Sequence, residues 1–494
     1  MGILVAIDQG TTGTTVSLVD ADMNIVATYT QEFPQHYPQP GWVEHRADQI
    51  WQSVLEAAHG ALRVAGMAGK DIIAIGITNQ RETTLVWDRF THTPIHNAIV
   101  WQCRRTAPQC QKLREDGYET TVKQTTGLVV DAYFSGTKIA WLLDSVPGAR
   151  TRAENGELAF GTIDSYLVWR LTGGKVHVTD ASNASRTMLM DIRSGQWSEE
   201  MAEILHVPMG ILPKICGNAE IYGFTENIPG IPNGIPIAGM AGDQQAALFG
   251  QTCFSAGESK LTLGTGAFFL VNTGVNLVAS RSGLLTTVAW RLGGDTTYAL
   301  EGSAFVAGAA VQWLRDGLGI LQHSSDIEPL AQTVRDSDGV VFVPAFVGLG
   351  APYWNQDARA AIFNLTRGTN RAHIARACLE GIALQNVDLL DAMAADIGAP
   401  VSAIKVDGGA SRNNLLMQMH ADFSGAVVIR PQTVETTSLG AALLAGLGVG
   451  LWKNLEQIRG IWKEDRQFLP QMNTDRVAQM RAQWDKAIRG VSIR

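Results

Sequence analysis

A carboxylate followed by a glycine-rich turn near the N-terminus is the first feature that could do chemistry. Residues 4–7 form an apolar run typical of a buried strand, Asp8 follows, and residues 10–13 (Gly-Thr-Thr-Gly) form a tight turn before a second apolar strand at 16–19. Such a turn offers backbone N–H groups and hydroxyls to phosphate oxygens, and the carboxylate can hold Mg²⁺ directly or through water. The alternative is a surface hairpin whose Thr and Gly only satisfy turn geometry.

The second half of the chain repeats this pattern. Residues 259–274 (SKLTLGTGAFFLVNTG) predict another strand, Gly-Thr-Gly turn and strand. Residues 403–414 (AIKVDGGASRNN) predict a strand, an Asp-Gly-Gly turn and the start of a helix, where the backbone can pass close to an adenine or ribose. Gly308, in a predicted helix, would likewise permit close approach of a flat ligand. Together these turns predict a nucleotide cleft with two walls.

Two further polar clusters could bind or activate a phosphate acceptor. Arg81 and Glu82 are adjacent between two apolar strands within residues 71–88, either as a solvated turn or as a site whose donors and acceptors complement a diol. Asp243 follows an apolar strand and precedes a helix, either as an ordinary N-cap or as an acid in a cleft. Residues 223–239 are dense in Gly and Pro and predict the connection into a second domain.

Length and composition set the limits. A chain of 494 residues exceeds what one core usually supports, and a net charge of −8 argues against a nucleic-acid surface. The five cysteines show no metal-ligand spacing, which favours reduced thiols in the cytoplasm. The longest apolar stretch, residues 439–452, is shorter than a membrane span, so no membrane insertion is expected.

The elements that must position these residues alternate between strands and helices. Three strands precede a helix carrying Val54, Ala58 and Leu62 at helical spacing, and residues 372–393 and 436–452 predict two further apolar helices. The part from Lys453 onward is polar and predicted to be helical. This order predicts an α/β protein with mixed sheets.

With these residues assembled, the chain closely resembles the FGGY family of carbohydrate kinases, nearly end to end. The runs that carry the resemblance include DQGTTGTT, GITNQRETT, AIVWQCRRT, TDASNASRTML, GMAGDQQAALFGQ, LGTGAFF and VDGGASRNN. The resemblance implies an α/β fold of two actin-like, ribonuclease-H-like domains with mixed sheets flanked by helices. It places the active site in the interdomain cleft between residues 1–247, with the acceptor site and first phosphate hairpin, and 248–494, with the second hairpin and the adenosine site.

The resemblance also implies an activity and roles for individual residues. GITNQRETT together with IVWQCRRT is similar to the members that phosphorylate glycerol with ATP and Mg²⁺, and relatives are commonly homodimers or homotetramers. Asp243 matches the general base. The implied glycerol-binding residues are Arg81, Glu82, Trp101, Tyr133, Asp243, Gln244 and Phe268. The implied nucleotide-binding residues are Thr11, Thr12, Gly13, Thr265, Gly308, Gln312, Gly409 and Asn413. Asp8 and Asp243 match the acids around Mg²⁺.

Two alternatives remain at this point. One is a kinase of the same family acting on another small polyol, such as erythritol or dihydroxyacetone. The other is an actin- or Hsp70-like ATPase, which shares the paired phosphate hairpins but does not account for Arg81, Glu82 and Asp243. The chain also departs from the family at Thr15, where many relatives have an arginine.

Overall fold

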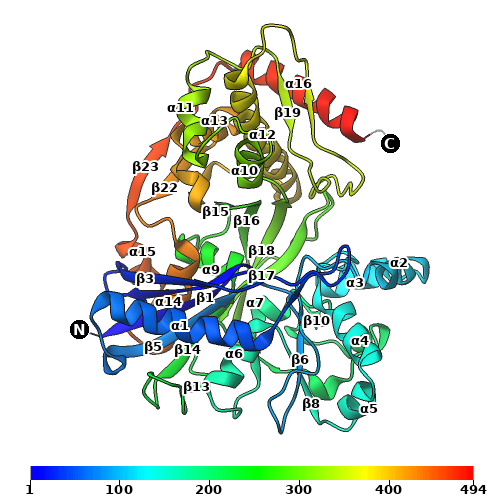
Figure 1. Ribbon diagram of the computed structural model, residues 1–494, viewed down its shortest axis with the longest axis vertical. Coiled ribbons are helices and arrows are strands. Elements are labelled where there is room, and N and C mark those ends of the chain that lie inside the picture. Colours follow the sequence, from blue (N-terminus) through cyan, green and yellow to red (C-terminus); the bar gives the residue numbers. More distant parts are fainter. Residues whose placement is uncertain (1, 493–494) are drawn as a thin grey trace.

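Two mixed β-sheets organise the chain, which the computed structural model describes over residues 2–492 (Figure 1). The first sheet has six strands, in the spatial order β13 (Gly223–Phe224), β14 (Pro236–Gly242), β5 (Ile72–Asn79), β1 (Ile3–Gln9), β2 (Gly13–Val19) and β3 (Ile25–Glu32). β1 pairs parallel with β5 and antiparallel with β2. Because β5 also pairs parallel with β14, the carboxyl ends of β1, β5 and β14 lie at one edge of the sheet.

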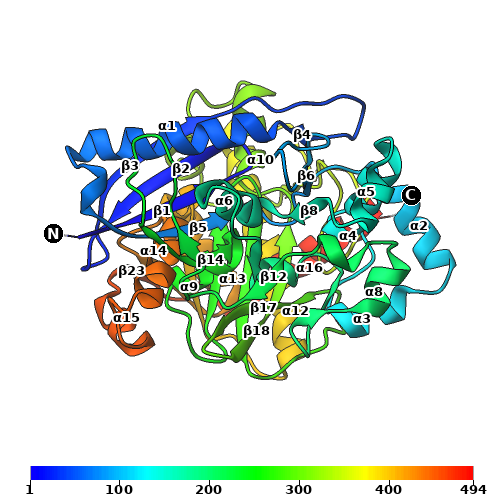
Figure 2. The same ribbon diagram turned by 90° about the horizontal axis from the view of Figure 1, so that it is seen from below.

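Alternating side chains of β1 bury both faces of this sheet. Ile3, Val5 and Ile7 pack on one side, with α1 (Ala47–Ala65) and α6 (Ile163–Leu171). Leu4 and Ala6 pack on the other side, with α9 (Asp243–Gly250) and α14 (Thr436–Gly448). Figure 2 shows α1 and α14 on opposite sides of the strands. With helices on both faces, Asp8 at the end of β1 lies at the edge of a sheet that is covered on each side and is itself half-buried.

The second sheet has seven strands and supplies the other half of the fold. Their order is β17 (Leu285–Leu292), β18 (Asp295–Ala304), β16 (Ala267–Gly274), β15 (Ser259–Leu263), β21 (Ala403–Asp407), β22 (Val427–Pro431) and β23 (Glu464–Phe468). Its main core includes side chains of α10 (Gly308–Asp316), α12 (Arg371–Ile397), α13 (Asn414–Ser424) and α16 (Thr474–Ser492). The prediction of an α/β fold with two mixed sheets flanked by helices is confirmed.

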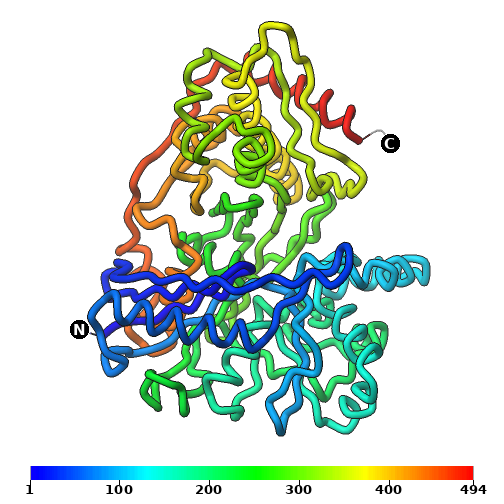
Figure 3. Tube along the Cα trace, in the orientation of Figure 1, coloured from blue at the N-terminus to red at the C-terminus, as the bar shows by residue number. Residues whose placement is uncertain are grey.

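Helix α14 joins the two halves, although it comes from the C-terminal part of the sequence. Figure 3 follows the orange segment down to the blue strands of the first sheet. A Cβ built at Gly76 of β5 would lie 2.0 Å from Ala441 O, and one built at Gly440 would lie 1.8 Å from Ala246 O. Glycine is therefore required at both positions, at Gly76 where β5 meets α14 and at Gly440 where α14 meets α9. The same core also holds Leu270 and Ala299 of the second sheet.

A smaller lobe packs beside the first sheet and contributes the loop before α4 (Ser135–Ser145). Its other helices are α2 (Ala107–Glu115), α3 (Glu119–Thr126), α5 (Ala149–Glu154) and α8 (Glu199–Ile204), whereas α7 (Ala181–Ala184) packs in a core with β17 and β18 of the second sheet. Its short strands are β4 (Glu44–His45), β6 (Leu85–Asp88), β7 (Ala98–Ile99), β8 (Leu158–Gly161), β9 (Val178–Asp180), β10 (Met190–Asp191), β11 (Gln196–Trp197) and β12 (Lys214–Cys216). The second half also contains α11 (Ile327–Ala331), β19 (Val341–Val343), β20 (Ala361–Phe363) and α15 (Leu455–Ile461).

Residues 223–239, predicted as the connection into a second domain, also contribute to the first sheet, because β13 pairs antiparallel with β14 and β14 pairs parallel with β5. The prediction that the part from Lys453 onward is helical is wrong in part, since β23 pairs with β22 at the edge of the second sheet. None of the helices within residues 2–492 is long and apolar enough to cross a membrane.

Candidate active site

The first predicted phosphate turn has the expected hairpin geometry. In the pairing of β1 with β2, Asp8 lies opposite Thr15, and the Gly10 N–H donates to Gly13 O at 2.9 Å. Thr11 and Gly13 are half-buried and Thr12 is exposed. The backbone and hydroxyls of residues 11–13 are therefore available to an anion at this edge of the sheet.

Asp8 is half-buried at the carboxyl end of β1 among other acids. Burial, with repulsion from Asp243 and Glu435, raises the pKa of Asp8 to about 7. Its closest side-chain donor is the Ser438 hydroxyl, 3.5 Å from Oδ2. Within residues 2–492 no ion pair forms with this carboxylate, and a half-buried carboxylate facing two other acids is an environment that favours a bound cation.

The second hairpin is held by the start of α10. The Gly264 N–H donates to Gly266 O at 2.9 Å, and the Ala307 and Gly308 N–H groups donate to carbonyls of the turn at 2.8 and 3.0 Å. A Cβ built at Gly308 would lie 2.6 Å from Gly264 O. The close approach predicted at Gly308 is therefore to the hairpin itself. Thr265 at the turn and Gln312 one turn along α10 are both exposed.

The predicted adenosine turn follows β21. Gly408 has φ +81°, and a Cβ there would lie 2.6 Å from Leu263 O, so the turn fits closely over the second hairpin. Gly409 is exposed, with nothing within 4 Å of its built Cβ. Asn413 caps α13 by accepting from Leu416 N at 2.8 Å. Arg430 Nη1 stabilises the turn by donating a hydrogen bond to Ser411 O at 2.9 Å.

Arg81 and Glu82 are buried, so the solvated-turn alternative is wrong. Their side chains are 2% and 1% exposed. Arg81 Nε lies 3.1 Å from Asp243 Oδ1, and Arg81 Nη2 lies 3.4 Å from the Tyr133 hydroxyl. Glu82 adopts φ +60°, a region that non-glycine residues rarely occupy. The structure thus brings Arg81, Glu82, Tyr133 and Asp243 together.

Two buried partners of this cluster, Arg186 and Glu301, were not singled out from the sequence. Arg81 Nη1 and Nη2 donate to the two carboxylate oxygens of Glu301 at 2.5 and 2.9 Å. Arg186 Nε donates to Glu82 Oε1 at 2.7 Å. A lone acid within the apolar strand 298–306 was a usable signal for Glu301, because such a charge is rarely buried without a partner.

Trp101 and Tyr133, two of the predicted aromatic residues, link the acceptor cluster to the first phosphate turn. Trp101 Nε1 donates to Thr11 Oγ1 at 3.0 Å, and the rings of Trp101 and Tyr133 meet edge to face with centroids 5.6 Å apart. Phe268 is half-buried on β16, opposite Thr262 and Ser303. Within residues 2–492 no ring-to-ring contact joins Phe268 to the other two.

Asp243 and Gln244 begin α9 at the carboxyl end of β14. The N-cap of α9 is Gly242, so the alternative in which Asp243 is an ordinary N-cap is wrong. The Asp243 side chain is 32% exposed, in contrast to its buried neighbours. Gln244 Oε1 accepts from the buried Lys260 Nζ at 2.5 Å, and burial lowers the pKa of Lys260 to about 8. Lys260 is a third residue that sequence reasoning missed.

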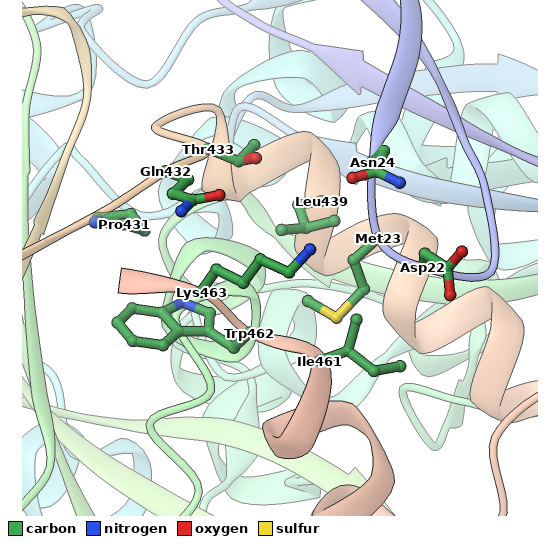
Figure 4. Close-up of a pocket in the computed structure, with 10 residues that line it drawn as sticks. All are labelled: Asp22, Met23, Asn24, Pro431, Gln432, Thr433, Leu439, Ile461, Trp462 and Lys463. Carbon is green, nitrogen blue, oxygen red and sulfur yellow. The ribbon is translucent and has the colours of Figure 1, made fainter. Parts of the chain in front are cut away.

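Two hollows near the end of β22 lie apart from this cluster. One, of about 40 Å³, has room for a few water molecules and is lined by side chains that include Met23, Leu439 and Trp462 (Figure 4). The other, of about 250 Å³, is lined by Arg412 and Arg430 among others. Neither hollow is lined by a predicted site residue. The candidate active site is therefore the cluster around Arg81, Glu82 and Asp243, between the two sheets.

Comparison with known proteins gives consistent matches along the chain. Residues 3–250 match the N-terminal domain, and residues 259–449 the C-terminal domain, of the FGGY family of carbohydrate kinases. The chain is 57% identical over 487 residues to a glycerol kinase of Myxococcus xanthus, covering 98% of each chain. It is 55% identical to a glycerol kinase of Deinococcus radiodurans, over 98% of this chain and 96% of that one.

Solved structures agree with the sequence matches. A Plasmodium falciparum glycerol kinase crystallised with ADP has a TM-score of 0.93 at 36% identity, covering 100% of this chain and 99% of that chain. A ligand-bound xylulose kinase of Lactobacillus acidophilus has a TM-score of 0.86 at 22% identity, covering 99% of this chain and 98% of that chain. The second likeness shows the shared fold alone.

Proposed function

The chain belongs to the FGGY family of carbohydrate kinases, and from this membership we propose that it transfers the γ-phosphoryl group of ATP to glycerol, forming sn-glycerol 3-phosphate. The observation that carries the proposal is the 57% identity to a glycerol kinase across 98% of both chains. The cluster of Arg81, Glu82, Tyr133 and Asp243 supports it, because donors and acceptors there suit a small polyol.

Asp243 is the proposed general base. The terminal hydroxyl of glycerol attacks the γ-phosphorus in line, the new O–P bond forms as the bond to ADP breaks, and the hydroxyl proton passes to the Asp243 carboxylate. Its partial exposure, next to buried neighbours, suits a group that must meet substrate. Arg81, Glu82, Tyr133 and Gln244 orient the hydroxyls, while Trp101 and Phe268 cover the carbon skeleton.

The two hairpins are proposed to hold the nucleotide. Residues 11–13 and Thr265 donate neutral hydrogen bonds to the phosphates, and Gly308, Gln312, Gly409 and Asn413 lie along the path of the nucleoside. In this division, residues 1–247 carry most of the acceptor site and residues 248–494 the adenosine site. Closure of the two halves would exclude water and limit ATP hydrolysis.

Asp8 and Asp243 are the proposed magnesium ligands. Within residues 2–492 no group of three or more His, Cys, Asp or Glu side chains could hold a metal ion by itself. This does not argue against Mg²⁺, which is usually held by one or two carboxylates together with substrate phosphates and water. When bound, Mg²⁺ supplies positive charge to the phosphate oxygens.

A substrate panel tests the assignment. Glycerol, erythritol and dihydroxyacetone are compared in an assay that couples ADP release to a second enzyme. The proposal expects the highest kcat/KM with glycerol, and ATP consumption that ignores every polyol would contradict it. A cytoplasmic location is proposed from the five cysteines, all buried and unpaired. A homodimer or homotetramer is proposed by analogy with relatives, to be measured by light scattering.

A further inference from the structure

Glu301 connects the two sheets at the acceptor cluster. Glu301 lies on β18 of the second sheet, whereas Arg81 follows β5 of the first sheet. The Glu301 carboxylate accepts a hydrogen bond from each terminal nitrogen of the Arg81 guanidinium. Burial opposes ionisation of Glu301, but Arg186 and Arg81 outweigh it and lower its pKa to about 2. A bidentate pair of this kind fixes the plane of the guanidinium as well as its charge. The direction of the remaining Arg81 donor, Nε toward Asp243, is thereby also fixed.

Arg186 holds the other half of the cluster. It follows α7, its side chain is fully buried, and it donates to Glu82 Oε1 at 2.7 Å and to Glu301 Oε1 at 3.0 Å. Its guanidinium carbon also lies 5.7 Å from the centroid of the Tyr133 ring. Arg186 therefore touches two residues expected to bind glycerol and reaches a third, Arg81, through Glu301.

The charge of Glu82 depends on this partner. Burial raises the pKa of Glu82, and the positive charges of Arg81 and Arg186 oppose that rise. The groups facing Glu82 are Arg81, Arg186, Glu301, Tyr133 and Lys138. Arg81 Nε is 3.9 Å from Glu82 Oε1, too far for a hydrogen bond, so Arg186 makes the only side-chain hydrogen bond to this carboxylate within residues 2–492.

We propose that Arg186 and Glu301 are positioning residues for the acceptor. Arg186 aims the Glu82 carboxylate and Glu301 fixes the Arg81 guanidinium, so the glycerol-binding pair is complete only when β18 is docked against the first sheet. This inference rests on the proposed function and deepens it. It adds two residues beyond those that the family resemblance implies.

Arg186→Gln gives the direct test, with the Michaelis constants of glycerol and ATP measured from pH 6 to pH 9. At neutral pH the glycerol KM should rise about 10- to 100-fold, the loss expected for one charged hydrogen bond, while the ATP KM changes less than about twofold. The glycerol KM should then fall as pH rises and Glu82 ionises again. Burial lowers the pKa of Lys138 to about 8, so Lys138 titrates in the variant and in the wild type alike. The readout is therefore the difference in glycerol KM between the two proteins at each pH.

Three further variants separate positioning from a loss of structure. Arg186→Lys retains the charge and should recover part of the glycerol affinity. In a Glu82→Gln background, Arg186→Gln should add no pH dependence, because the titrating group is gone. Arg105→Gln is the matched control: Arg105 is buried, donates to Glu44 at 2.7 Å and stacks on the Trp42 ring. It should lower stability without a pH-dependent glycerol KM.

The outcomes distinguish this inference from the proposed function. Equal rises in both Michaelis constants, or a glycerol effect of the same size at every pH, would overturn the role of Arg186. If Arg186→Gln does not fold, Glu301→Gln and Arg186→Lys carry the test, since both should raise the glycerol KM and leave the ATP KM unchanged. A wild-type enzyme that turns over no glycerol would overturn the proposed function, and this inference with it.

Discussion

Arg81 Nε lies 3.1 Å from Asp243 Oδ1, so the proposed base and the proposed acceptor-binding arginine are in direct contact. One residue follows β5 and the other begins α9 after β14, two parallel neighbours in the first sheet. The contact exists because parallel strands bring their carboxyl ends to the same edge. A donor on Oδ1 of the base holds that oxygen in place and leaves Oδ2 open to a hydroxyl.

Replacing the base should abolish turnover without abolishing binding. We expect Asp243→Asn to lower kcat by at least about 100-fold, the usual scale for loss of general-base catalysis, because the amide cannot accept the proton. Glycerol should still bind, since the amide oxygen can keep the Arg81 contact. Steady-state turnover and calorimetric glycerol binding measure the two effects. Turnover near the wild-type rate would contradict the assignment.

Removing Arg81 should affect glycerol far more than ATP. Arg81→Ala removes the donors that face Tyr133 and Asp243. It also removes one of the two arginines that donate to the buried Glu301 carboxylate, so that only Arg186 still donates to it among the described residues. We therefore expect a large rise in the glycerol KM, a small change in the ATP KM and a lower melting temperature. Equal changes in both Michaelis constants would argue against a polyol contact. Arg105→Gln controls for the loss of a buried arginine.

Strong local patterns predicted much of the fold. The hairpin of β1 and β2 and that of β15 and β16 follow from apolar runs interrupted by glycine-rich turns, and the apolar runs 372–393 and 436–452 correspond to α12 and α14. β23 was missed because its sequence, EDRQF, is charged and exposed, as edge strands often are. The strand before Asp243 was predicted, but the first residues of β14 were assigned to the connection at 223–239 because of its glycines and prolines, whereas Gly239 is there to admit α14.

The site was predictable only in part, for a different reason. Asp8 and Asp243 can be predicted because each directly follows an apolar run typical of a strand. Glu301, Arg186 and Lys260 lie within or beside regular elements, and the partners of Glu301 and Arg186 are distant in sequence: Arg81 and Glu301 are 220 positions apart. No local pattern encodes such a pair, because only the docking of the two sheets brings the charges together.

Lys260 should matter to the acceptor site although nothing in its local sequence marks it. Its Nζ donates to Gln244 Oε1 at 2.5 Å and to Thr262 Oγ1 at 2.8 Å. Lys260→Met frees the Gln244 amide, and we expect kcat/KM for glycerol to fall about 10-fold or more, as for other charged hydrogen bonds. Lys405→Met is the control. Lys405 lies opposite Lys260 on the neighbouring strand β21, but its Nζ donates to Gln251 O and not to Gln244. Similar losses in both variants would point to a general effect on the sheet.

Asp388 should make stability depend on pH. Burial raises its pKa from 3.8 to about 6, despite hydrogen bonds from Trp484 Nε1 at 2.7 Å and the Tyr353 hydroxyl at 2.8 Å. Because the native state holds this proton more tightly than the unfolded chain, stability falls as pH rises from about 4 through about 6, by up to about 3 kcal/mol. Asp388→Asn cannot titrate, so its melting temperature relative to wild type should rise between pH 4 and pH 7. A difference in melting temperature between Asp388→Asn and wild type that stays the same from pH 4 to pH 7 would contradict the raised pKa of Asp388.

Two adjacent glycines in the adenosine turn offer a paired test of the nucleotide site. Gly408 has φ +81° and a built Cβ 2.6 Å from Leu263 O, whereas Gly409 has an ordinary φ and nothing within 4 Å. Gly408→Ala should therefore lower the melting temperature, because the turn must move away from the second hairpin. Gly409→Ala should leave the melting temperature of the free protein unchanged.

Nucleotide binding then separates the two roles. If Gly409 lies against the nucleoside as proposed, its new methyl group meets only the ligand, so the Kd for ADP should rise while the free protein stays as stable as wild type. Calorimetry with ADP and thermal melting without it measure the two quantities on the same samples. Unchanged ADP affinity in Gly409→Ala would place the nucleoside elsewhere. A stability loss equal to that of Gly408→Ala would mean that the turn is constrained by the protein at both positions.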